Sequence, residues 1–136
     1  MTVTVVPQPL GDILDPYFIR TGLVGSGGVK QGYIVKHDTT VQEIVLASAA
    51  TDASVGMALA DADAGKYASY AKLGQYTRAV AGAALSSLNT ELAADSSGRF
   101  AAATTGDTVI GKNKTTASGA DVTFTVELVL PYKKPA

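Results

Sequence analysis

The segment 106–112 (GDTVIGK) has the strongest chemical signature in the chain. Its glycines and lysine have the spacing of a phosphate-binding loop. In such a loop the residue after the lysine is a Ser or Thr that binds magnesium, but here it is Asn113. The run Thr108-Val109-Ile110 is also more typical of a strand than of a loop that cradles an anion. We therefore expect no nucleotide site.

Ser69 and Lys72 have the spacing of the serine–lysine pair of some acyl-transfer enzymes. That chemistry needs the serine at the start of a helix, together with further partners. These two residues belong to a predicted strand, in which residues three apart point to opposite faces. His37 is the single histidine, and no serine lies in a Gly-x-Ser-x-Gly elbow, so we interpret His37 as a solvated turn residue.

Metal and cofactor sites are also not expected. Asp61 and Asp63 could bring two carboxylates to one cation, but the segment lacks the further acidic and glycine positions of a calcium-binding hand. The chain has no cysteine, which excludes disulfides and thiolate chemistry. The Asn113-Lys114-Thr115 triplet fits a glycosylation acceptor, but without a secretory signal it indicates only a surface loop. We expect a protein that is not an enzyme, with its function in its surfaces.

Size and charge limit the classes of partner. A chain of 136 residues suits one domain, and its 46% hydrophobic content is sufficient for a core. With three Phe, six Tyr and no Trp that core is thin, so an oligomer or partner could complete it. A net charge of −1 without charge blocks argues against nucleic acid. No secretory signal and no apolar run of about 20 residues is present, so we expect no membrane contact and synthesis in the cytoplasm.

The first 28 residues differ from the rest. Three prolines interrupt regular structure there, and four glycines follow between positions 22 and 28. We expect an extended N-terminal arm over 1–28, a domain over 29–130, and an exposed tail over 131–136. The arm is too apolar for a solvated tail, and it packs either on its own domain or on another subunit. Its candidate partner-binding residues are Leu10, Ile13, Tyr17 and Phe18.

From residue 29 onward the pattern predicts strands. Apolar residues alternate with polar ones over 122–130, and shorter strand patterns cover 41–46, 55–60, 67–71, 76–80 and 108–112. Asp- and Gly-containing turns separate them. Leu85, Leu88 and Leu92 have helical spacing, so at most one short helix is expected. The prediction is a mainly β fold, a small barrel or sandwich.

Two stretches look like copies of one unit. The segment 55–71 contains Val55-Gly56 and a later strand, and 110–130 repeats this order with Ile110-Gly111. The preceding segments 29–35 and 79–85 look similar to each other. We therefore predict a quasi-duplicated β unit.

The order of several short phrases resembles the capsid decoration (cement) proteins of tailed bacteriophages. The phrases are AGAAL at 81–85, DSSGR at 95–99, ATTGDTVIG at 103–111, GADV at 119–122 and VELVL at 126–130, with KQGYIV at 30–35, VGMA at 55–58 and AG at 64–65 in the first half. The resemblance covers about residues 29–130. Residues 1–28 are longer and more apolar than the family's usual start.

The resemblance implies a β-barrel-like domain that binds the major capsid protein on the outer surface of an assembled shell, commonly as a homotrimer, and stabilises the shell. It implies no catalytic residue and no cofactor. Leu10, Ile13, Tyr17 and Phe18 would then anchor the arm on a neighbouring subunit or on the shell. Other possibilities are a tail-tube or baseplate β-domain, and a glycan-binding module that uses exposed tyrosines.

Overall fold

The computed structural model describes residues 18–38 and 43–136, and the regular elements in this part of the chain are strands. The mainly β prediction is confirmed. No helix over these ranges is long and apolar enough to cross a bilayer. In chain order the strands are β1 (Ile19–Leu23), β2 (Ile34–His37), β3 (Ile44–Leu46), β4 (Ser54–Ala58), β5 (Tyr67–Ala71), β6 (Gly74–Val80), β7 (Glu91–Ala94), β8 (Phe100–Ala102), β9 (Thr108–Asn113) and β10 (Thr123–Lys133).

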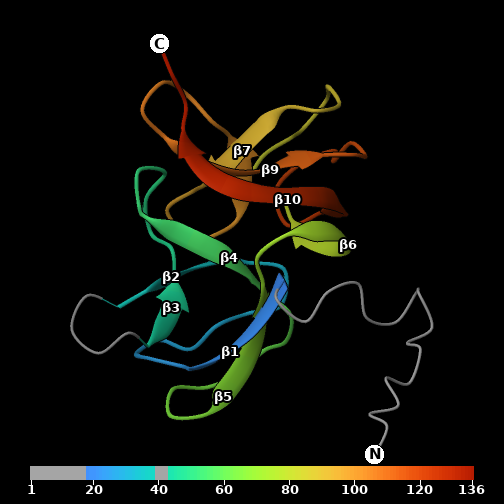
Figure 1. The fold of residues 1–136 in the computed structure, drawn as a ribbon. Helices are drawn as coiled ribbons and strands as arrows, with labels where there is room; N and C mark the ends of the chain where they lie inside the picture. Colours follow the sequence, from blue (N-terminus) through green and yellow to red (C-terminus); the bar gives the residue numbers. More distant parts are fainter. Residues whose placement is uncertain (1–17, 39–42) are drawn as a thin grey trace, which may run out of the picture.

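The strands form two antiparallel sheets with the same topology. The first has the order β1-β5-β4-β2-β3, and the second has the order β6-β10-β9-β7-β8. Adding five to each strand number converts one order into the other. Figure 1 shows the first sheet as the lower half of the molecule and the second as the upper half. The predicted duplication of a β unit is therefore present at the level of topology.

The duplication extends to single bridges between residues. Val24 pairs with Ile44 in parallel and Val29 with Ala62 in antiparallel orientation, while Ala81 pairs with Phe100 and Leu85 with Ala117 in the same two ways. Each second-half residue lies 55 to 57 positions after its counterpart. The expected alignment of segment 29–35 with 79–85 is therefore wrong in register. The bridges match Leu85 to Val29, whereas the expected alignment matched it to Val35.

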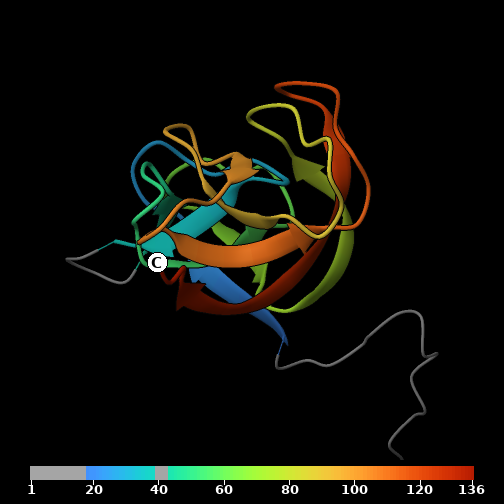
Figure 2. The same ribbon diagram turned by 90° about the horizontal axis from the view of Figure 1, so that it is seen from above.

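Each sheet curls until its two edges meet. Val24 directly follows β1 and bridges to Ile44 at the start of β3, which are the two edges of the first sheet. The backbone N–H of Gly25 also donates to the Ile44 carbonyl at 2.9 Å, and that of Gly82 repeats this with Phe100 at 2.8 Å. Figure 2 shows β9 (orange) and β10 (red) curving around the interior of the second half. Each half thus approaches a small closed barrel.

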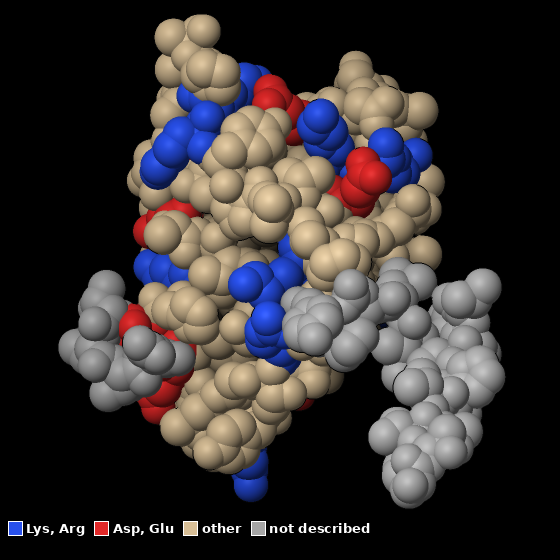
Figure 3. Space-filling model, in the orientation of Figure 1, with Lys and Arg blue, Asp and Glu red and all other residues tan. Residues whose placement is uncertain are grey.

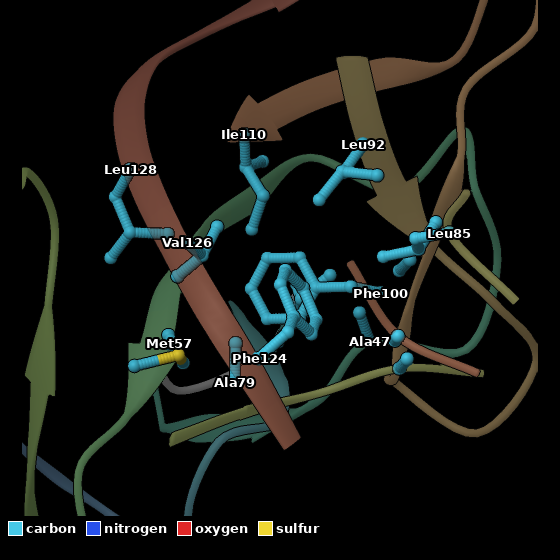
Figure 4. Close-up of a cluster of buried hydrophobic side chains, with 14 of the residues drawn as sticks. Ala47, Met57, Ala79, Leu85, Leu92, Phe100, Ile110, Phe124, Val126 and Leu128 are labelled. Atoms are coloured by element: carbon cyan, nitrogen blue, oxygen red, sulfur yellow. The ribbon is translucent and has the colours of Figure 1, made fainter. Parts of the chain in front are cut away.

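Large and small side chains occupy different positions in the two interiors. Tyr70 pairs with Ala58 in the first half, whereas the corresponding pair in the second is Val126 with Asn113. Two positions earlier on the same strands, Ala68 corresponds to Phe124. A large residue in one half thus matches a small one in the other. In the second half, Phe124 packs edge-to-face on Phe100 with ring centres 5.6 Å apart (Figure 4).

The halves share one core across their junction. Met57 and Ala47 of the first half are buried beside Phe100 and Phe124 of the second (Figure 4). Backbone hydrogen bonds also join the halves: the N–H of Ile34 donates to the Gly98 carbonyl at 2.6 Å, and that of Thr108 donates to the Ala50 carbonyl at 2.9 Å. The two repeats therefore pack as one body.

Two expected boundaries differ from the structure in detail, and the optional short helix is absent from the described residues. Strand β1 lies inside the stretch expected to be an arm, because Gly22 and Val24 are needed where the first sheet closes. Strand β10 runs on to Lys133, and the N–H of Lys134 donates to the Asp107 carbonyl at 2.9 Å, inside the expected tail. The spacing of Leu85 and Leu92 reflects a bridge and strand β7 facing one core, not a helix.

Candidate interaction surfaces

The phosphate-loop-like segment 106–112 falls mainly in strand β9, and Asn113 at its end is fully buried. The Asn113 Oδ1 accepts a hydrogen bond from the N–H of Thr90 at 2.8 Å. Its Nδ2 donates to the carbonyls of Ser87 at 2.8 Å and Thr115 at 3.1 Å. The side chain thus holds the loop before β7 to the end of β9, and the segment forms a strand rather than an anion-binding loop.

Ser69 and Lys72 lie within and just after a strand, not at the start of a helix. Ser69 lies in β5 opposite Thr21, and Lys72 follows the strand. The backbone N–H of Lys72 donates to the Phe18 carbonyl at 2.6 Å. This pair therefore serves sheet formation at the point where the chain enters β1.

His37 ends β2 and its ring meets that of Tyr70 edge-on, with centres 6.2 Å apart. It borders a surface cleft of about 250 Å³ that also contains Lys36 and Asp52. The Lys36 ammonium pairs with the Asp52 carboxylate at 2.9 Å. Burial opposes ionisation of Asp52, but hydrogen bonds from the Ser48 backbone and from Lys36 outweigh it and hold the Asp52 pKa below its ordinary value. The cleft's charges thus stabilise the loop after β3.

The predicted acidic turn is built into the fold. Asp61 Oδ1 accepts a hydrogen bond from the backbone N–H of Gln31 at 2.8 Å, and so connects two loops. Among residues 18–38 and 43–136 no group of three or more His, Cys, Asp or Glu side chains is placed to hold a metal ion.

Of the four expected partner-binding residues, Leu10, Ile13 and Tyr17 lie outside the described residues. Phe18 is half-buried at the start of β1. It is followed by Ile19, which is 39% exposed on the outer face of the first sheet. Near the other end of β5, Tyr67 is 73% exposed and pairs with Leu23. The pair between them on this face is Thr21 with Ser69, so Ile19 and Tyr67 are two separate exposed apolar side chains.

The most informative difference between the halves is one row of side chains that are paired across the strands of each sheet. In the first half, cross-strand pairing connects Ile34, Met57, Ala71 and Ile19 across β2, β4, β5 and β1, which we call the apolar row. In the second half the same register connects Glu91, Lys112, Glu127 and Gln75 across β7, β9, β10 and β6, which we call the charged row.

The two rows differ in their exposure to solvent. Ile34, Met57 and Ala71 are at most 1% exposed because they pack against the second half. The charged row keeps access to solvent, and burying it in the same way would remove its charges from water at a cost of several kcal/mol per ion. The molecule is thus a stack of two repeats whose second member ends in a polar face, as terminal repeats of solenoid proteins do.

Ion pairs occupy that polar face. The Lys134 ammonium lies 3.2 Å from the Glu91 carboxylate, and the Lys114 ammonium lies 3.3 Å from that of Glu127. The Tyr132 hydroxyl donates a short hydrogen bond to Glu91, which raises the pKa of Tyr132 to about 12. The same bond, with that from Lys134, lowers the pKa of Glu91. The end of β10 and the residue after it are thereby connected to β7 on the polar face of the second half.

A second cleft, of about 170 Å³, lies at the junction of the halves. Its lining comes from the end of β4, from β6 and from the loop before β2: Gln31, Met57, Ala58, Leu59, Tyr76, Thr77 and Arg78. Figure 3 shows a mostly uncharged face, with basic and acidic groups mixed in its upper part and basic groups without a visible acidic neighbour near its middle.

Sequence reasoning did not find the two rows or this junction cleft. The rows could have been recognised by aligning the halves 55 to 57 residues apart and reading the pairing register across each sheet. The cleft depends on how the halves pack, which no local pattern reports.

Comparison with known proteins identifies the fold. The sequence matches no protein-family model and no curated protein. Among solved structures, the chain is similar to the N base of the head fiber gp8.5 of bacteriophage phi29, with a TM-score of 0.63 and 17% sequence identity. The match covers 82% of this chain and 92% of that one. At this level of identity the likeness concerns the fold.

Proposed function

We propose that the chain is a structural, non-enzymatic component of a tailed-phage virion that attaches to the outer surface of the assembled capsid and stabilises it. The observation that carries the proposal is the fold: the two-repeat β body is similar to the base of a phage head fiber over most of both chains. The phrases that resemble capsid decoration proteins fall in the same repeats and point to the same class. The major capsid protein is the proposed partner.

The architecture suits attachment without catalysis. The potentially catalytic segments are built into strands and turns, where Asn113 and Asp61 make structural hydrogen bonds. The junction-spanning core and the ion-paired polar face give a rigid body of two repeats. Such a body presents its surfaces in a fixed geometry, which lowers the ordering cost of binding.

We further propose that the chain acts as a homotrimer. Three linked copies on a symmetric shell gain avidity, because once one copy is bound the others bind intramolecularly at a high effective concentration. Leu10, Ile13, Tyr17 and Phe18 are proposed to anchor the arm on a neighbouring subunit or on the shell. Removal of residues 1–16 tests the contribution of Leu10 and Ile13 while leaving β1, which begins at Ile19, in place.

The test is co-sedimentation with undecorated heads of the phage that encodes the chain, combined with the mass in solution from light scattering. The proposal predicts a mass three times the 13.8 kDa of one chain, and pelleting that saturates with added protein. A tail-tube or baseplate component would instead form larger rings and remain in the supernatant. A monomer that does not pellet with heads contradicts the proposal.

A further inference from the structure

The junction cleft combines an apolar floor with a cationic rim. Met57 and Ala58 are at most 1% exposed, and Leu59 packs partly against the shared core. The cleft's volume of about 170 Å³ is below the roughly 300–1,000 Å³ of sites that enclose a whole small molecule. Its size and floor therefore suit one apolar side chain of a larger partner.

The polar groups around this floor differ in how far they are already engaged. The Gln31 amide donates to the Leu59 carbonyl at 3.2 Å, and the Tyr76 hydroxyl donates to the Leu73 carbonyl at 3.0 Å. Arg78 is exposed, and among residues 18–38 and 43–136 no acidic side chain forms an ion pair with it. Its guanidinium has the fork of donors that a carboxylate accepts.

The repeat is irregular at this cleft. Between the pairs Val126–Tyr76 and Phe124–Ala79, β6 advances three residues while β10 advances two. The extra residue is a bulge that includes Thr77 and Arg78, both exposed. In the first half the equivalent pairing of β1 with β5 is regular from Ile19 to Leu23. The fold can therefore be built without this bulge, and bulges are frequent where a strand re-aims a side chain at a functional site.

We propose that the junction cleft binds a segment of a protein partner that inserts an apolar side chain over Met57 and Leu59 and places a neighbouring carboxylate on Arg78. Charge complementarity identifies the occupant, because the rim carries a cation without an acidic partner and the floor carries no charged side chain. The assignment of this segment to the capsid rests on the proposed function. The chemistry of the site rests on the cleft alone.

Binding to undecorated heads is compared for the parent, Arg78→Glu, Arg78→Lys and Lys66→Glu proteins. Lys66 is exposed and does not line the junction cleft, so Lys66→Glu is a matched control that makes the same change in net charge. The proposal predicts at least a tenfold loss of affinity for Arg78→Glu, since a charge-assisted hydrogen bond becomes a repulsion. Arg78→Lys keeps the charge but loses the fork of donors, so its affinity should lie between those of the parent and Arg78→Glu. Lys66→Glu should bind like the parent. Equal binding by Arg78→Glu and Lys66→Glu overturns the proposal.

A second measurement separates this proposal from the function. Amide chemical shifts are followed by NMR during titration with N-acetyl-leucinate, which has an apolar side chain and a carboxylate, and with N-acetyl-leucinamide, which lacks the charge. The expected result is shifts at Leu59, Thr77 and Arg78 that are larger for the acid and absent in Arg78→Glu. If the parent does not bind heads yet shows these shifts, the proposed function fails and the site stands. If neither heads nor the acid bind, the site is refuted as well.

Discussion

Replacing Asn113 by alanine tests how the second half is held together. The substitution recreates the first half, where Ala58 occupies the equivalent position opposite Tyr70. It removes the hydrogen bonds from Thr90 and to Ser87 and Thr115. Each bond contributes about 0.5–1.5 kcal/mol, and Asn113 is fully buried. We therefore expect a loss of about 3 kcal/mol in the free energy of unfolding, or roughly 10 °C in Tm for a domain of this size.

The assay is urea and thermal unfolding followed by circular dichroism. Gln75→Ala is the matched control, because it also removes a side-chain amide from a strand, but an exposed one. It should change the free energy of unfolding by less than about 0.5 kcal/mol. If Asn113→Ala is as stable as this control, the assignment of Asn113 as the polar tie of the second half is wrong.

Four further substitutions have defined outcomes. Gly32 has φ +84°, and a Cβ there would lie 2.0 Å from a carbonyl oxygen of β6, so Gly32→Ala should prevent a stable fold. Gly106 has φ +89° but open space around it. Gly106→Ala should therefore lower the free energy of unfolding in urea by only about 1 kcal/mol. Phe124→Ala should lose about 3–5 kcal/mol in the same assay, since Phe124 is 3% exposed. The pKa of Asp52 lies below its unfolded value of 3.8, so its contribution is present above that pH and is lost as pH falls through the folded pKa; Asp52→Asn should flatten the acid limb of Tm against pH below about pH 4.

Strand positions could be predicted because they depend on local alternation. The patterns over 67–71, 76–80, 108–112 and 122–130 correspond to β5, β6, β9 and β10. Alternation directly encodes which side chains face a core, and the turns between strands carry Asp and Gly for conformational reasons. The mainly β class and the duplication followed from these patterns.

The alignment of the repeats could not be read from the same patterns. Segments 29–35 and 79–85 both contain a glycine among small apolar residues, and this similarity suggested a match that the bridges displace. Gly32 is required by its close approach to β6, whereas Gly82 lies against Asp95. Two glycines with different causes thus look alike in sequence. Compensating exchanges such as Ala68 for Phe124 hide the true correspondence further.

The candidate interaction surfaces were the least predictable feature because they arise from packing between the halves. The apolar row looks like ordinary core in sequence, and the charged row looks like ordinary surface. Only the register shows that Met57 and Lys112 occupy equivalent positions. Likewise, Arg78 has no local signal, and its relation to Leu59 exists only after the halves have stacked.

Attachment to the outside of the capsid is tested most directly by electron cryomicroscopy of undecorated heads incubated with the purified chain. Added density is expected on the outer surface of the shell, grouped in threes, into which the two-repeat body fits. Heads whose reconstruction is the same with and without the protein would contradict it.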